Sequence, residues 1–332
     1  MDRILLGHGS GGKLMHELIK KYIAPVFELH SLMDSAIVSI NHSGKLAITT
    51  DSYTVSPIFF PGGDIGDLAI NGTVNDLAVV GAIPLYLTVG FILEEGFPIS
   101  DFERVLNSIS NAAKKAGVKI VAGDTKVVDK GKGDGIFINT SGIGIVPEGI
   151  ELSPFKIEVG DKVIISGSIG NHGIAVMTER NGFVFDPPVL SDSRALNGLI
   201  SEILKEFAPY IKVMRDPTRG GVATTLKELA LESSKDILIY ENMIPLHDTV
   251  KGACELLGLD PLYVANEGIF IAIVKSSVAD KIIELMKSHS FGEESAIIGE
   301  VTGESGKVLL KTSIGGTRIV DMLPGEQLPR IC

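Results

Sequence analysis

Apolar side chains recur at helical spacing in three segments of the first half of the chain. They form one stripe along residues 13–27, and the same period continues through residues 64–80 and 101–116. Such stripes are typical of amphipathic helices that pack on a core. Ser100 and Gly117 flank the third segment, so we expect an N-cap and a C-cap there.

Segments rich in β-branched residues lie between these helices. Residues 36–40 and 45–50 are strand-like, and the Asn-His-Ser-Gly segment 41–44 between them predicts a turn. Two further strands are expected over residues 119–122 and 135–146. The first half therefore reads as a mixed succession of helices and strands.

The second half is also a succession of helices and strands, and a segment without periodicity separates it from the first. Residues 147–155 are rich in turn formers and lack periodicity, which is typical of a domain boundary. A buried strand is expected in residues 160–167. Helices are expected over residues 196–207, 221–233 and 278–288. We therefore predict two α/β domains (α+β type), covering residues 1–150 and 151–322, and a flexible tail over residues 323–332.

Composition excludes several classes of protein. The 332 residues carry a formal net charge of −11, which argues against nonspecific nucleic-acid binding. The uncharged run 77–93 contains Gly81, Pro84 and Gly90, so it reads as a helix end, a turn and a buried strand rather than a membrane span. Only two cysteines are present, which fits a reducing cytoplasm. Cys254 lies in a helical pattern and is expected to be buried.

A glycine-rich segment opens directly into the first expected helix. Backbone N–H groups in such a loop can bind phosphate at a helix N-terminus. The spacing matches a P-loop, but Leu14 stands where a Ser or Thr would bind Mg²⁺. A flexible terminal turn is the alternative. The predicted phosphate-binding residues are Gly9, Ser10, Gly11, Gly12 and Lys13.

Four aspartates occupy positions that suit a magnesium site. Asp34 precedes a strand, Asp51 ends one, Asp76 lies in an apolar helix, and Asp216 comes just before a helix. Magnesium takes oxygen ligands and shares them with phosphates. Each aspartate taken alone is better explained as a cap or turn residue, and it is the four together, beside a phosphate loop, that favour a metal–nucleotide site.

Three more charged residues are candidates for a site. Asp124 and Lys126 follow a strand, and Lys126 is a candidate to neutralise a transferring phosphoryl group. Glu267 lies between apolar runs, where burial would raise its pKa and suit it to act as a base. The alternatives are a solvated lysine and an ordinary turn glutamate.

The last residue is a cysteine. Pro324, Gly325 and Pro329 argue against regular structure in the terminal segment, so Cys332 is expected on a tether. A thiol there can be modified in one place and processed in another. The alternative is a frayed terminus whose cysteine has no role.

Together these motifs resemble the HypE family of hydrogenase maturation proteins. That family belongs to an ATP-binding superfamily with aminoimidazole ribonucleotide synthetase and selenophosphate synthetase. The likeness covers the whole chain, and the terminal Pro-Arg-Ile-Cys makes it specific for HypE. The segments that carry it are Gly7–Lys13, Thr49–Asp51, Asn75–Ala78, Gly123–Lys126, Asp216–Gly221 and Pro329–Cys332.

The resemblance implies a fold, a reaction and partners. The fold would be the two-domain synthetase fold, with an N-terminal mixed sheet that forms a barrel in a homodimer. A carbamoyltransferase, HypF, would carbamoylate Cys332. ATP and Mg²⁺ would then drive dehydration to a thiocyanate, whose cyanide passes to iron on a HypC–HypD complex. Asn75, Asp124 and Thr125 would contact the nucleotide, Glu267 would be the base and Lys126 the charge stabiliser.

Two other functions are considered beside this interpretation. A sibling synthetase or kinase of the superfamily would not need the terminal cysteine. A non-catalytic scaffold that binds ATP and presents its tail would not need several carboxylates in apolar segments, which are costly without a partner. The dehydratase is therefore the favoured interpretation.

Overall fold

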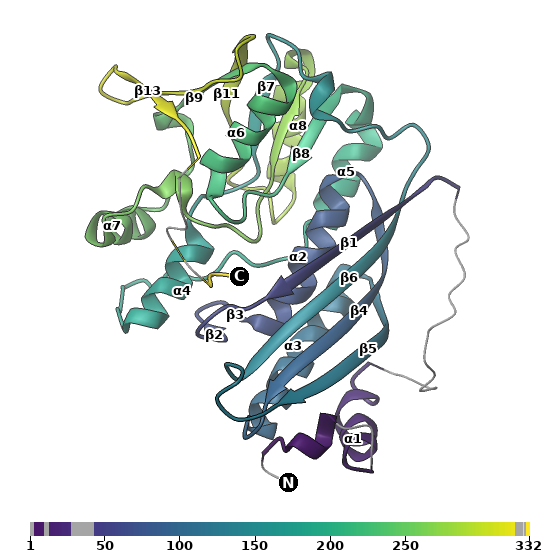
Figure 1. Cartoon of the computed structure of the whole chain (residues 1–332). Helices are drawn as coiled ribbons and strands as arrows, with labels where there is room; N and C mark the ends of the chain where they lie inside the picture. The colour runs from purple at the N-terminus through teal and green to yellow at the C-terminus, as the bar shows by residue number, and fades with distance from the viewer. Residues whose placement is uncertain (1–2, 10–12, 28–42, 323–327, 329) are drawn as a thin grey trace.

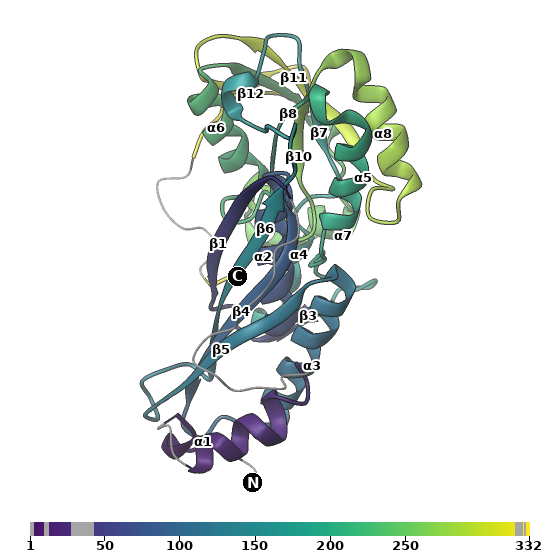
Figure 2. The same cartoon turned by 90° about the vertical axis from the view of Figure 1, so that its right-hand side faces the viewer.

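The computed structural model describes residues 3–9, 13–27, 43–322, 328 and 330–332. Two α/β halves stack along the long axis of the molecule, and each is built on its own sheet (Figure 1, Figure 2). The mixed α/β architecture expected from the sequence is confirmed.

The first sheet has the strand order β1-β6-β4-β5. Its members are β1 (Lys45–Tyr53), β4 (Ile83–Glu94), β5 (Lys119–Val128) and β6 (Ile136–Val146). Among these described strands, β4 and β5 pair in parallel and the other neighbours pair antiparallel. Helices α2 (Ile65–Val79) and α3 (Ile99–Ala116) cover one face of the sheet (Figure 1).

Local chemistry fixes where these two helices begin and end. Asp64 and Asp67 form a capping box at the start of α2. The side chain of Asp64 accepts the backbone N–H of Asp67, and the side chain of Asp67 accepts the backbone N–H of Asp64. Gly117 ends α3 in the left-handed conformation, as predicted. The N-cap prediction was wrong, because the chain enters α3 at Pro98 and Ser100 already lies inside the helix.

The N-terminal segment differs from the single helix expected over residues 13–27. Helix α1 covers only Lys13–Leu18, and a π-helical turn, η2 (Ile19–Ile23), follows it. This segment lies at the end of the first sheet that is remote from the second half (Figure 1, Figure 2). The expected strand 36–40 and the first two residues of the expected turn 41–44 lie outside the described residues.

The second half is built on a larger sheet with the strand order β13-β12-β9-β11-β7-β10-β8. Helices α5 and α8 pack on one side of it and α6 packs on the other. The strands are β7 (Lys162–Ile165), β8 (Ile211–Arg215), β9 (Asp236–Tyr240), β10 (Ile271–Val274), β11 (Ala296–Gly303), β12 (Val308–Lys311) and β13 (Thr317–Val320). The helices are α4 (Asn171–Asn181), α5 (Asn197–Phe207), α6 (Gly221–Ser233), α7 (Asp248–Leu257) and α8 (Ala279–Ser288).

Short elements join these units. The two-residue strands are β2 (Phe59–Phe60) and β3 (Gly63–Asp64). The 3₁₀ turns are η1 (Leu6–Gly9), η3 (Pro154–Lys156), η4 (Ala208–Tyr210), η5 (Glu241–Met243), η6 (Pro261–Tyr263) and η7 (Ser276–Val278).

Several expectations from hydropathy are confirmed. The uncharged run 77–93 is the end of α2, a turn and the buried strand β4. Every helix in the described part of the chain is too short or too polar to cross a membrane. Cys254 is 1% exposed, and burial raises the pKa of its thiol to about 12.

The two halves also share a core. The C-terminal end of α2 packs with α5 and with strands of the second sheet, while α4 and α7 pack against the first half. The junction between the halves is therefore tightly packed, and residues from both can meet there.

Candidate functional site

Acidic residues from both halves meet in one cavity of about 240 Å³ at this junction. They come from β1, from the middle of α2, from the loop after β8 and from the loop before β10. The last residue of the chain lines the same cavity, and the C-terminus lies close to α2 and α4 in both views (Figure 1, Figure 2). The lining residues are Thr50, Asp51, Gly72, Asp76, Asp216, Thr218, Arg219, Glu267 and Cys332.

Strand alternation and the long helix α2 bring the first two aspartates together. Asp51 alternates with the exposed Thr50 and Ser52, so its side chain points to the helix-covered face of the sheet. On α2, Asp76 accepts a hydrogen bond of 2.9 Å from the hydroxyl of Thr49. Burial raises the pKa of Asp76, and the charge of Asp51 adds to the effect.

The second half supplies the two most perturbed carboxyl groups. Burial, and then the charge of Asp76, raise the pKa of Asp216 to about 7. Glu267 is 3% exposed, and its Oε1 has no hydrogen-bond partner in the described part of the chain. Burial raises its pKa well above the ordinary value, with Asp216 and Asp192 the next largest causes. A buried carboxyl with an unpartnered oxygen in a cavity suits proton transfer or cation binding.

A turn of the backbone holds Glu267 in place. The carboxylate of Asp192 accepts the N–H groups of Glu267 at 3.2 Å and of Gly268 at 3.1 Å. A Cβ at Gly268 would lie 1.6 Å from the carbonyl oxygen of Asp192, so only glycine allows this approach.

Asn75 belongs to this support rather than to the cavity lining. Its amide donates to the carbonyl oxygens of Glu267 and Arg194, at 3.1 and 3.0 Å, and accepts the N–H of Leu196 at 2.8 Å. Both of its N–H donors are used in this way. We therefore expect Asn75 to position the Glu267 turn, and its contact with the nucleotide stays a prediction.

The cavity has the ligand chemistry for a magnesium ion. Asp51, Asp76, Asp216 and Glu267 face one another closely enough to raise pKa values in the cluster. Among the described residues, no group of three or more metal-ligating side chains has the spacing to bind one ion directly. Mg²⁺ usually keeps several waters and shares phosphate oxygens with one or two carboxylates, so it does not require three protein ligands. Asp34 lies outside the described residues.

The start of α6 offers a place for phosphate. Gly220 takes a left-handed conformation at the N-cap, and no side chain caps the helix. Uncapped N–H groups and the helix dipole favour an anion at such an end. Thr218 and Arg219 line the cavity beside it. The sequence pointed to Asp216 as the site residue of segment Asp216–Gly221, although the Thr-Arg-Gly-Gly run after it has the composition of an anion-binding turn.

Asp124 and Lys126 lie on the opposite face of the first sheet. They flank the buried Thr125 on β5, and each points to the face that α2 and α3 leave open. Their side chains form an ion pair of 2.7 Å and are 60% and 59% exposed. Within one chain, the predicted charge stabiliser is therefore separated from Glu267 by the sheet itself.

The glycine-rich segment lies further away still. Gly9 ends η1 and Lys13 begins α1, at the far end of the first sheet (Figure 1, Figure 2). Ser10, Gly11 and Gly12 are outside the described residues. The single site expected from the sequence is thus divided in the described part of the chain: of the predicted residues placed there, Asp51, Asp76, Asp216, Glu267 and Cys332 line one cavity.

The last residues of the chain are docked on the first half. The N–H groups of Thr54 and Ser56 donate to the carbonyl oxygens of Cys332 and Arg330, at 3.1 and 3.2 Å. Ile331 is 2% exposed and packs in the core. The last residues therefore lie alongside the segment that follows β1, and Cys332 lies in the acidic cavity.

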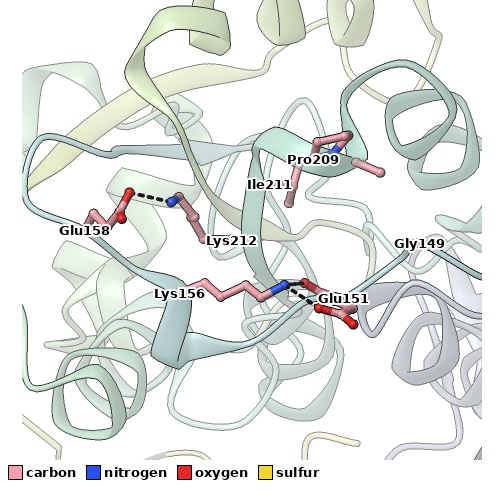
Figure 3. A pocket seen from close by; sticks show the side chains of 8 residues that line it. Gly149, Glu151, Lys156, Glu158, Pro209, Ile211 and Lys212 are labelled. Atoms are coloured by element: carbon pink, nitrogen blue, oxygen red, sulfur yellow. Dashed lines mark hydrogen bonds and ion pairs between the residues drawn. The ribbon is translucent and has the colours of Figure 1, made fainter.

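A second hollow, of about 220 Å³, lies beside the edge strand β8 (Figure 3). Its lysines are already paired: Lys156 contacts Glu151 at 3.0 Å and Lys212 contacts Glu158 at 2.7 Å. Exposed pairs of this kind are common surface features. The acidic cavity is the better candidate for chemistry.

Comparisons with known proteins agree with this geometry. The N-terminal domain family of AIR synthase related proteins matches residues 32–146, and the corresponding C-terminal domain family matches residues 158–311. Carbamoyl dehydratase HypE of Rhizobium leguminosarum bv. viciae is 49% identical over 99% of this chain and 95% of its own length.

Two solved structures are also similar. A hydrogenase maturation protein HypE in complex with ATP has a TM-score of 0.95 and 45% identity, and the match covers 99% of each chain. A HypE–HypF complex contains a chain with a TM-score of 0.82 and 49% identity, covering 94% of this chain and all of that one.

Proposed function

This chain belongs to the HypE proteins of the AIR synthase related family, and we propose that it acts as a carbamoyl dehydratase on its own C-terminal cysteine. The reaction converts S-carbamoyl Cys332 to S-cyanocysteine, the source of the cyanide ligand in [NiFe]-hydrogenase maturation. The observation that carries this proposal is the position of Cys332, in one cavity with Asp76, Asp216 and Glu267.

The chemistry explains why a phosphoryl donor is needed. The carboxamide oxygen is a poor leaving group, and transfer of the γ-phosphoryl group of ATP to that oxygen makes phosphate the leaving group. The C–O bond then breaks and both nitrogen protons are lost as the C≡N bond forms. The products are the thiocyanate, ADP and phosphate. The protein has to hold the amide oxygen in line and neutralise developing charge.

Glu267 is the proposed base for the amide nitrogen. Its raised pKa gives the carboxylate enough basicity for proton transfer, and its unpartnered Oε1 is available to a substrate hydrogen. Asp192 and Asn75 fix the backbone on either side of it. The site therefore has a positioned base beside the end of the tail.

Mg²⁺ is proposed as the cofactor, held by Asp51, Asp76 and Asp216 of the cavity, with Asp34 the fourth expected ligand. Bound there, it would supply charge neutralisation for the phosphates. Thr218, Arg219 and the uncapped start of α6 support phosphate binding next to it.

The open face of the first sheet supports a homodimer. It exposes Leu46, Ile48, Ile83 and Ile92, and Ile48 is 72% exposed. Directly paired residues of neighbouring strands share a face, so the register of Ile92 with Lys126 puts the lysine on this apolar surface. We propose that two such faces close into a shared barrel. Lys126 of one protomer, with Asp124, would then serve the acidic cavity of the other.

Partners and location follow from the proposed reaction. The similar HypE–HypF complex supports HypF as the carbamoyl donor, and a HypC–HypD complex that carries iron is the proposed acceptor of cyanide. Two cysteines, of which one is buried, are consistent with work in the reducing cytoplasm.

Intact mass measurement tests the proposal. The protein is carbamoylated and then given ATP and Mg²⁺. We expect a further loss of the mass of one water, with one ADP released per chain. Cys332→Ala should abolish both mass changes. A tail-presenting scaffold predicts no loss of water and no stoichiometric ADP, and that result would overturn the proposal.

A further inference from the structure

Helix α4 directs two basic side chains at the backbone of the docked tail. His172 is fully buried, and its Nε2 lies 2.8 Å from the carbonyl oxygen of Ile331. Arg180 donates from Nη2 to the carbonyl oxygen of Arg330 at 2.8 Å. Neither residue lines the acidic cavity, and the dehydration described above does not use them.

Burial and two contacts set the protonation of His172. A carbonyl oxygen can only accept, so Nε2 carries a proton and donates to Ile331. Burial lowers the pKa of His172 and favours the neutral ring, so Nδ1 accepts from the hydroxyl of Ser191, which lies 2.9 Å away. The Ser191 oxygen in turn accepts the N–H of Ser193 at 3.1 Å. The neutral imidazole is therefore held in one tautomer, aimed at the tail.

Arg180 links the tail to the segment after β1 on which it docks. Its Nε donates to the carbonyl oxygen of Ser56 at 2.7 Å, while the N–H of Ser56 donates to Arg330. One guanidinium thus bridges two extended segments that already pair with each other. A planar fork of donors suits this double contact better than the point charge of a lysine would.

These contacts recognise backbone and leave the sulfur out. The carbonyl oxygens of Arg330 and Ile331 are the same whether Cys332 carries a thiol, a carbamoyl group or a cyano group. Withdrawal of the tail leaves the buried N–H of His172 without its acceptor, which favours docking again. Such a site can hold every chemical state of the tail in the same register.

We propose that His172 and Arg180 form a tail latch, a pair of positioning residues that hold the Arg330 and Ile331 carbonyls and so place Cys332 in the acidic cavity. This inference rests on the proposed function, because it assigns the docked tail as the substrate. The latch fixes how far the sulfur lies from the reacting groups. The latch positions the sulfur of Cys332, whereas Glu267 accepts a proton from the amide nitrogen.

Thiol alkylation of the whole, unmodified protein tests the latch. Cys332 is the reporter, since Cys254 is buried and its thiol has a raised pKa. His172→Phe keeps a ring packed on Phe60 but removes the donor, and Arg180→Leu removes the other contact. Each should speed iodoacetamide labelling of Cys332 about fivefold, the factor expected for one lost hydrogen bond. Peptide mass measurement follows the labelling.

Matched variants separate positioning from folding. His172→Gln keeps an N–H donor and should label close to the wild-type rate. His289→Phe, remote from the tail, is the control for losing a histidine. In turnover assays, the latch variants should lower kcat and leave the KM for ATP unchanged. Arg180→Leu keeps the test decisive where His172→Phe fails to fold.

Unchanged labelling in both latch variants, with thermal unfolding like the wild type, would overturn the latch. The labelling experiment needs neither ATP nor a carbamoyl donor. Failure of the proposed dehydration would therefore show only in the mass assay, and failure of the latch only in the labelling rates and the split between kcat and KM.

Discussion

The two faces of the first sheet show opposite chemistry on the same strands. The face covered by α2 carries Asp51 toward a buried acidic cavity, where pKa values rise because charges lose water. The open face carries isoleucines and an exposed ion pair between Asp124 and Lys126. Side chains alternate along a strand, so one sheet can serve a reaction on one face and assembly on the other.

The contrast shows that charged groups perturb one another strongly where they are buried and weakly where water screens them. On the open face, water screens Lys126 and Asp124, and their interaction contributes little. In the cavity, Glu267 is nearly out of contact with water, and every nearby carboxylate shifts its pKa. If two open faces meet in a dimer, Lys126 also leaves water. The comparison therefore predicts that assembly turns an ordinary surface lysine into a site residue.

The largest effect is expected at Glu267 in the cavity. Glu267→Gln keeps the shape of the side chain and removes its basicity, so kcat for thiocyanate formation should fall by at least about 100-fold. Glu294→Gln, on the surface beside His247, is the control and should leave kcat unchanged. The two rates are compared by mass measurement of the tail. If kcat falls less than about tenfold in Glu267→Gln, this residue is not the base.

A mixing experiment tests whether the two faces meet across a dimer. Lys126→Ala and Glu267→Gln are each expected to be weak enzymes, because each lacks one side of the shared site. After the two variants are mixed and their subunits exchanged, half of the dimers hold one intact site. About one quarter of all sites should then be active. Light scattering follows the assembly.

The mixing result has a clear contrary outcome. If Lys126 acts within its own chain, no mixture regains activity. Ile48→Lys is the companion variant, since a charge on the open face should prevent assembly and leave a monomer with an intact fold.

Stability should move in the opposite direction to activity at Asp216. Its pKa in the folded protein rises from an ordinary 3.8 to about 7, so the folded state loses stability as pH rises through that range. At pH 8 without nucleotide or metal, Asp216→Asn should stabilise the fold by up to about 4 kcal/mol, from about 1.4 kcal/mol per pKa unit. Denaturant unfolding at pH 5 and pH 8 measures the difference.

Asp236 provides the control of opposite sign. Its carboxylate accepts hydrogen bonds from the hydroxyl of Ser305 and from the backbone, and these lower its pKa. Stability from that group is present above its ordinary pKa and is lost as pH falls. Asp236→Asn should therefore destabilise the protein at pH 8. If both variants change the free energy of unfolding in the same direction at pH 8, burial does not explain the raised pKa of Asp216.

The smallest effect is expected at the ion pair on the open face. Asp124→Asn should change the free energy of unfolding of a monomeric background, such as Ile48→Lys, by less than about 1 kcal/mol, because both groups are exposed. A larger change would mean that this face is not open to water in the monomer.

Local rules predicted most of the fold from the sequence. The helix over residues 221–233 begins and ends where expected, and Gly117 ends α3. Strand β5 runs on to Val128, beyond the expected end at Ala122, because pairing with β4 continues through Gly123 and Asp124. That register depends on a neighbour that local propensity does not reveal.

The sequence also predicted the acidic cluster, but it did not predict that Lys126 and Asp124 lie on the other face of the sheet. Asp51, Asp76 and Asp216 sit in segments whose apolar surroundings make an unpaired carboxylate costly. Lys126 was placed with them because it ends the same kind of strand, and its face depends on β5 register. His172 was not among the candidates from the sequence, because its contact with Ile331 joins residues 159 positions apart.

The central claim is that the acidic cavity transfers phosphate to the tail's own carbamoyl oxygen. A heavy-oxygen label in that carbamoyl group tests it most directly. With ATP present, we predict that the label appears in the released phosphate, in proportion to the S-cyanocysteine found at Cys332. Label recovered in bulk water, with thiocyanate still formed, would contradict the claim.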